Sequence, residues 1–140
     1  MASASDFVEK RTLDFWLKNN SESTSSPSAV HVALFTADPT DSAGLTNFEN
    51  EVSTSGTNYS RKQVTFGTID STGGSVSNSG NVTFDAATSS FGTVTHIGIC
   101  DGATAGAGQL LFHGALDASK AIGTGDTFQI TAGNLTVTMA

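Results

Sequence analysis

Apolar and polar residues alternate through most of the chain between Val30 and Met139. In the first such segment, Val32 and Leu34 share one face while Ala33 and Phe35 share the other, so both faces are apolar and a central strand is expected. Such segments recur between turn-forming residues at about eight places, which predicts an antiparallel β-sandwich or jelly-roll-like domain. The predicted strands are Val30–Thr36, Tyr59–Ile69, Val76–Asp85, Val94–Cys100, Gln109–Leu116, Thr127–Ala132 and Leu135–Met139, with Asp117–Ile122 as a further short strand or a connector.

Two pairs of these segments read as hairpins. Val94–Cys100 and Gln109–Leu116 flank a connector of Asp, Gly, Ala and Thr, and the glycines inside them, Gly98 and Gly114, indicate a close backbone approach or a bulge. At the end of the chain, Gly133-Asn134 supplies a bend, which predicts that the last two segments form a final hairpin.

The segment Ser3–Asn20 is predicted to be the one helix. Asp6 with Glu9 resembles a capping box, with Ser5 as a rival N-cap, and Asn19 and Asn20 suit the C-terminal end. A broad apolar arc faces a polar one formed by Lys10, Arg11, Asp14 and Lys18; the arc consists of Val8, Thr12, Leu13, Phe15 and Trp16. The helix either covers a face or an open end of the β core, or uses Phe15 and Trp16 to dock on a neighbouring subunit.

The length predicts a single domain, 1–140, with the helix in 1–20 and the sandwich in 29–140. The formal net charge of −7 argues against a nucleic-acid partner, because a phosphate backbone is bound by Lys and Arg. No apolar run reaches the length of a membrane span, so no membrane partner is expected. The single cysteine, Cys100, is expected to be a buried free thiol. Arg61-Lys62 is interpreted as charge protecting an exposed strand edge.

The titratable residues do not form a recognisable catalytic motif. The three histidines, His31, His96 and His113, lie within predicted strands on differing faces and without metal-ligand spacing. Several acids could in principle bind a cation or supply a glycosidase pair, but turn formation explains them better; they are Asp38, Asp41, Asp85, Asp101, Glu49 and Glu51. We therefore expect no enzyme activity and no catalytic, cofactor-binding or metal residues.

Several blocks together resemble a family of small bacteriophage virion structural proteins, described as tail-fibre-like and related to capsid decoration, or cement, proteins. The blocks are VHVALFTADPTD at 30–41, NYSRKQVTFG at 58–67, FGTVTHIGICD at 91–101, LLFHGAL at 110–116 and IGTGDTFQITAGNLTVTM at 122–139. Phe91 and Phe112 stand where that family often has Trp, and Cys100 where an aromatic residue is frequent. These are changes of core size that leave the implied fold intact.

The resemblance implies a virion protein, assembled in the host cytoplasm, without catalytic residues. The leading expectation is a capsid decoration protein that binds the major capsid protein and stabilises the shell, through the helix and the long loop Ala43–Asn58. The alternative is a tail or tail-fibre component, and a third is a carbohydrate-binding module with Trp16, Phe48 and Tyr59 as its aromatic platform. Partners are other virion proteins and copies of the chain, with a trimer as the expected homo-oligomer.

Overall fold

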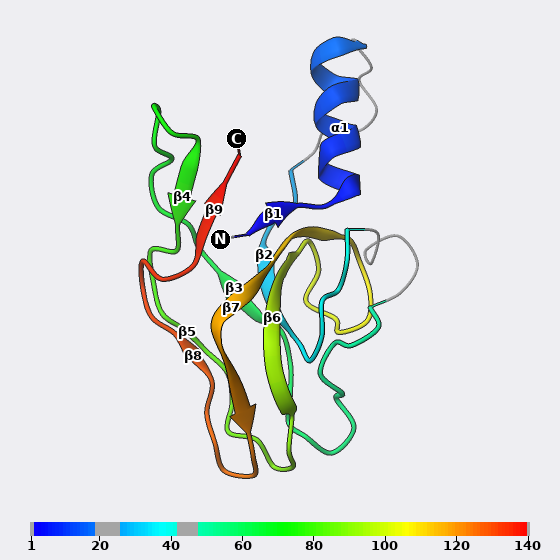
Figure 1. The fold of residues 1–140 in the computed structure, drawn as a ribbon, viewed down its shortest axis with the longest axis vertical. Coiled ribbons are helices and arrows are strands. Elements are labelled where there is room, and N and C mark those ends of the chain that lie inside the picture. The colour runs from blue at the N-terminus through cyan, green and yellow to red at the C-terminus, as the bar shows by residue number, and fades with distance from the viewer. Residues whose placement is uncertain (1, 19–25, 42–47, 140) are drawn as a thin grey trace.

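The computed structural model describes residues 2–18, 26–41 and 48–139. Within these ranges one helix and nine strands form a mainly β fold with antiparallel sheets, which confirms the predicted fold class and the N-terminal helix (Figure 1). In chain order the elements are β1 (Ser3–Ala4), α1 (Asp6–Leu17), β2 (Val30–Phe35), β3 (Lys62–Val64), β4 (Ser75–Ser77), β5 (Val82–Thr83), β6 (Gly92–Cys100), β7 (Leu110–Ile122), β8 (Gln129–Ile130) and β9 (Thr136–Thr138).

One layer is a five-stranded sheet in the order β1-β7-β6-β2-β3. The predicted central strand is confirmed, because β2 lies between β6 and β3 and residues Val32 to Phe35 are all 0% exposed. The hairpin of β6 and β7 is also confirmed, with Ile97 opposite Gly114 and Gly98 opposite His113. Strand β7 continues to Ile122, so the predicted connector is strand, interrupted by a register shift between its two halves.

The second layer consists of two short ladders, β4–β9 and β5–β8. The main hydrophobic core lies between the layers and includes Val32 and Leu34 from the sheet and Phe84, Phe128 and Val137 from the opposite side. A smaller cluster fills the other face of β2. Its members are Ala33, Phe35, Phe48, Cys100 and Leu110.

The predicted final hairpin is wrong. The chain does bend at Gly133, where φ is 83°, but β8 pairs with β5 and β9 pairs with β4. The buried side chain of Asn78 explains the difference: its Nδ2 donates to the Thr131 carbonyl at 3.1 Å and its Oδ1 accepts from the Leu135 N–H at 2.9 Å. These backbone groups at the bend are therefore bound to Asn78, and the two arms separate.

The predicted start of the helix is also wrong, because Ser3 and Ala4 form β1 opposite His113 and Phe112 of β7. Ser5 precedes α1 with an extended backbone, and its Oγ donates to the Leu110 carbonyl at 2.5 Å rather than capping the helix. Ala2 bridges to Val137 of β9. The N-terminal segment thus connects both layers before the helix begins; Asn19 and Asn20, the predicted terminators, lie outside the described residues.

Helix α1 stands at one end of the molecule, beyond the edge of the sheet (Figure 1). It contacts β1 and β7, but none of its residues is buried. The helix therefore does not cover a face of the β core. Docking of Phe15 and Trp16 on a neighbouring subunit stays a prediction.

Gly98 provides a test of the packing between β2 and β7. A Cβ at this position would lie 2.7 Å from Leu110 Cδ1 and 2.8 Å from Phe35 Cε2, both inside the smaller cluster. We expect Gly98→Ala to lower the free energy of unfolding by about 1–3 kcal/mol, because a filled core must shift to accept the methyl group. Urea denaturation measures the loss. Gly80→Ala, where nothing lies within 4 Å, is the control, and equal stability of the two variants would contradict the expectation.

Candidate functional site

The histidines considered as metal ligands lie on separate strands, β2, β6 and β7, and have different environments. Among residues 2–18, 26–41 and 48–139, no three His, Cys, Asp or Glu side chains gather so that they could hold a metal ion. His113 does meet two acids of the turn after β2: its Nε2 is 2.5 Å from Asp41 Oδ1, and its Nδ1 is 3.7 Å from Asp38 Oδ1. Asp38 also accepts the Thr40 N–H at 2.9 Å, as expected for a turn-forming residue.

The acids considered as a glycosidase pair are used in separate interactions. Asp85 pairs with Lys62 at 2.6 Å, Asp101 accepts the Gln109 N–H at 2.7 Å, and Glu51 binds Arg61. Glu49 is exposed. The carboxylates of Asp85, Asp101 and Glu51 thus form turns and ion pairs, which is a structural role.

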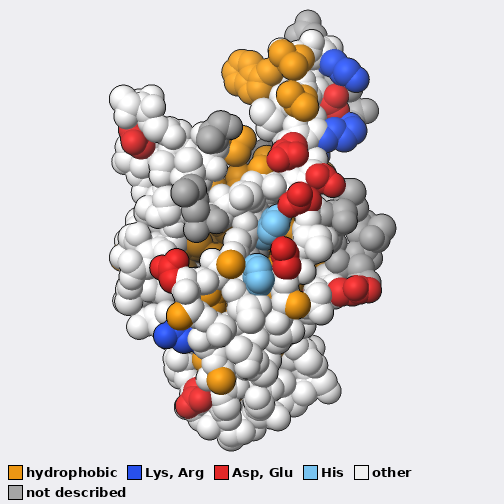
Figure 2. All heavy atoms as spheres, in the orientation of Figure 1, with side chains coloured by type: hydrophobic (Ala, Val, Ile, Leu, Met, Phe, Trp, Pro, Cys, Tyr) orange, Lys and Arg blue, Asp and Glu red, His pale blue; other side chains and the backbone are white. Residues whose placement is uncertain are grey.

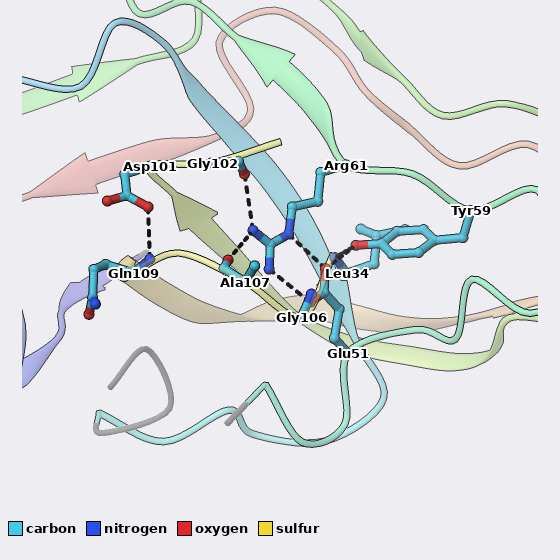
Figure 3. A network of polar contacts seen from close by, with 9 residues as sticks. All are labelled: Leu34, Glu51, Tyr59, Arg61, Asp101, Gly102, Gly106, Ala107 and Gln109. Atoms are coloured by element: carbon cyan, nitrogen blue, oxygen red, sulfur yellow. Dashed lines mark hydrogen bonds and ion pairs between the residues drawn. The ribbon is translucent and has the colours of Figure 1, made fainter. Parts of the chain in front are cut away.

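The most elaborate polar arrangement is centred on Arg61, and it overturns the interpretation of this residue as a solvated edge charge. The Arg61 side chain is 0% exposed and that of Glu51 is 4% exposed. Arg61 binds Glu51 in a bidentate manner, with Nε to Oε1 at 2.8 Å and Nη2 to Oε2 at 2.9 Å. Its Nη1 donates to the carbonyls of Gly102 and Ala107 at 3.0 and 2.9 Å (Figure 3). Lys62 differs: it is partly exposed and lies on the edge strand β3, where charge was expected.

Glu51 and Tyr59 extend this arrangement to three further parts of the chain. Glu51 accepts hydrogen bonds from the Tyr59 hydroxyl and from the Gly106 N–H, each at 2.8 Å. The Tyr59 hydroxyl in turn accepts the N–H of Leu34 in β2 at 3.1 Å. We call Glu51, Tyr59, Arg61 and the connector Gly102–Gly108 the arginine clamp. It joins β2, the segment after residue 48, the start of β3 and the loop between β6 and β7.

The electrostatics of the arginine clamp are those of a structural ion pair. Burial acts to lower the pKa of Arg61, but the hydrogen bond and charge of Glu51 outweigh it, and the pKa stands above its ordinary value. Burial, together with the Glu51 charge, raises the pKa of Tyr59. Both effects stabilise the protonated side chains, so neither residue is poised to exchange a proton near neutral pH.

A sequence signal for the clamp existed, because Tyr59 and Arg61 are two residues apart and so fall on the same side of an extended segment. Counted as whole residues, backbone included, both are buried, at 5% and 4% exposure. Their partner Glu51 is separated from them by an irregular loop, and no pattern in the sequence places it there.

The aromatic residues considered as a carbohydrate platform do not share a surface. Tyr59 and Phe48 are buried, and the Phe48 ring lies 4.5 Å from the Arg61 guanidinium carbon. Only Trp16 of the three is exposed, at 75%. The expectation of a platform formed by these three residues is therefore wrong.

Cys100 is fully buried, as expected, and burial raises its pKa to about 12. Helix α1, the only helix in the described ranges, is too short and polar to cross a membrane. The part of the chain that the structure describes thus contains an internal clamp and an inert thiol. Of the six large apolar side chains that are exposed in this part of the chain, four lie on α1 at one end of the molecule (Figure 2).

We expect Glu51→Gln to lower the free energy of unfolding by about 3–5 kcal/mol, because it leaves the buried Arg61 charge uncompensated. Asp85→Asn is the matched control, since it removes the partner of Lys62 at an acid that is 54% exposed and should cost no more than about 1 kcal/mol. Urea denaturation of both variants measures the difference. A loss at Glu51 no larger than that at Asp85 would show that the clamp is dispensable.

The raised pKa of Cys100 makes stability depend on alkaline pH. The folded protein keeps this proton up to about pH 12, whereas the unfolded chain releases it near the ordinary value of 9.0. The stabilisation is therefore complete below pH 9 and is lost as the pH rises toward 12, by up to about 1.4 kcal/mol per pH unit. Denaturation series across this window measure the slope. Cys100→Ala should reduce the slope and leave the contribution of Tyr59; an unchanged slope would refute this.

The chain also matches a known protein family over nearly its whole length. The family described as Podophage GP4 fiber I protein gp80 matches residues 3–138, which is almost the whole chain and includes β1, α1 and all later strands. No curated protein matches the sequence. The resemblance to phage tail-fibre-like structural proteins is confirmed, and the chain belongs to the Podophage GP4 fiber I protein gp80 family.

Proposed function

We propose that this protein is a structural component of the tail fibre of a bacteriophage. The observation that carries the proposal is the match of residues 3–138 to a family described as a phage fibre protein. The match extends through the helix and both β layers, so it concerns the whole fold and not one motif. It favours the tail-fibre alternative over capsid decoration, which was the leading expectation from the sequence.

The internal chemistry of the domain supports a structural role. The buried cation Arg61 is satisfied by Glu51 and by backbone carbonyls, and the one thiol is buried with a raised pKa. A catalytic site needs reactive groups that converge in an accessible cleft. In the described segments, Glu51, Asp85 and Asp101 instead take part in ion pairs and turns, which suits a module whose task is to keep its shape.

The partners that fit this role are other virion proteins and further copies of the chain. Fibres are built from repeated copies around an axis, and a trimer remains our expectation for the homo-oligomer. An acidic chain with a net charge of −7 is poorly suited to bind nucleic acid. The protein would function in the virion after assembly in the bacterial host.

Copy number per particle distinguishes a fibre from a capsid decoration protein. We expect purified virions to contain some tens of copies of this chain or fewer, because fibres are attached at a few symmetric positions of the tail. Quantitative mass spectrometry against the major capsid protein measures the ratio, and a cryo-electron microscopy reconstruction gives the location. The known capsid protein count provides the internal standard.

A high copy number would have a different meaning. Several hundred copies distributed over the shell would refute the fibre assignment and would restore the capsid decoration hypothesis. Absence of the chain from purified particles would refute both.

A further inference from the structure

Helix α1 exposes more apolar surface than any other element in the described ranges. Six large hydrophobic residues are exposed among the described residues. Four of them belong to the last five residues of α1: Leu13 at 57%, Phe15 at 47%, Trp16 at 75% and Leu17 at 77%. At about 100° per residue, these four side chains spread over an arc of roughly 200°. An arc of this width exceeds the stripe of about 100° that a helix needs to pack on one surface.

The fold prevents α1 from burying these residues against its own domain. The segment before the helix is held by the β1 pairing and by the buried Ser5 Oγ, which donates to the Leu110 carbonyl. The first turn lies beside the acids of the neighbouring turn, with the Asp6 N–H donating to the Asp41 carbonyl at 3.4 Å. The base of the helix is thereby fixed to the body, and its apolar second half projects away from the sheets (Figure 1).

The apolar arc of α1 borders a groove that extends toward the C-terminal strand. A groove of about 440 Å³ separates the helix from β9 and is lined in part by Thr12, Leu13, Thr138 and Met139. Met139 is 45% exposed. Leu13 belongs both to the exposed arc and to this groove, so the groove links the apolar arc of α1 to Met139, the residue after β9.

The charge distribution indicates what covers this surface. Residues 6–18 contain three acids and three basic residues, so the helix is neutral and holds half of the six Lys and Arg of the chain. The remaining residues therefore carry 10 acids against 3 basic residues, which accounts for the whole net charge of −7. Two copies of this acidic body repel each other. The neutral helix is the surface at which copies can approach without that repulsion.

We infer that α1 is a self-association element, and that its apolar arc packs against the α1 helices of other copies of this chain. The width of the arc allows each helix to contact two neighbours, as in a closed bundle of three helices around an axis. The polar side of the helix, where Lys10 pairs with Asp14 at 2.5 Å, then faces solvent. This inference rests on the self-association proposed for the fibre component, and it names the surface responsible.

The test uses the purified full chain, with Leu13→Gln/Leu17→Gln as the variant. Both side chains are exposed in the single copy, and Gln is a good helix former, so the variant should fold. Ile69→Gln is the matched control, because Ile69 is an equally exposed apolar residue, at 68%, outside the helix. Sedimentation equilibrium from about 1 to 100 µM gives the mass of each protein against the 14.3 kDa of one chain.

We expect the wild type and Ile69→Gln to form the same oligomer, and the double variant to associate at least about tenfold more weakly. Trp16, the only tryptophan, gives a second readout: its emission should shift to the blue with wild-type concentration, because association removes it from water. Far-ultraviolet circular dichroism checks that the variant keeps its fold.

Three results would overturn the inference. They are a monomeric wild type throughout this range, an oligomer that survives the double substitution, or an oligomer that Ile69→Gln disrupts as strongly. None of them bears on copy number in the virion, so the self-association element and the fibre assignment can fail independently.

Discussion

Strand β2 is buried on both faces, and this condition determines how the rest of the domain is arranged. Val32 and Leu34 on one side and Ala33 and Phe35 on the other are fully buried. A strand with two apolar faces must be covered twice. The first cover is the layer of short ladders, whose apolar side chains complete the main core. On the other face, the described residues include Phe48, which belongs to no strand, so the second cover there is a loop.

The loop cover explains why a buried ion pair is present. Phe48 packs with Phe35 in the smaller cluster, and the chain that follows it lies close to the sheet, where Glu51 bridges to Phe35. Irregular backbone in such a place has polar groups without ladder partners, which are costly to bury. Arg61 binds the carbonyls of Gly102 and Ala107, while Glu51 accepts the N–H of Gly106. The ion pair therefore satisfies the backbone polar groups of the loops that cover this face of β2. An apolar pair of side chains could not form these hydrogen bonds.

Some of these elements could be predicted from the sequence, and others could not. The apolar pattern identified the sheet strands, and β2 was recognised as central because both of its faces are apolar. Strand β1 was missed because two residues, Ser3 and Ala4, have no period and are held in place by β7. The final hairpin was wrong because Asn78, some 57 residues before Leu135, binds the bend. These errors share a cause: a distant partner decided the local structure.

The role of Arg61 was mispredicted for the same reason. Arg61 beside Lys62 looked like a pair of solvated charges, and only the second is one. What makes Arg61 a buried residue is Glu51, which lies in a loop without periodicity. A catalytic motif, in contrast, can be sought in a sequence, because such motifs combine residue types at a fixed spacing. A partner supplied by an irregular loop leaves no comparable pattern.

The N-terminal segment shows how one stretch of chain joins the closed interior to an open exterior. Ala2 and Ser5 are buried, at 4% and 0% exposure, whereas Trp16 and Leu17 are more than 70% exposed. The change occurs within about three turns of helix, a span of roughly 18 Å at 1.5 Å per residue. Because the buried end is fixed by hydrogen bonds to β7 and β9, the exposed end has a defined position. A flexible apolar tail would bind other surfaces indiscriminately, but an apolar helix held at a set distance from an acidic body can meet its partner only where that body does not collide or repel. The rigid β domain thus determines the direction in which the exposed half of α1 points.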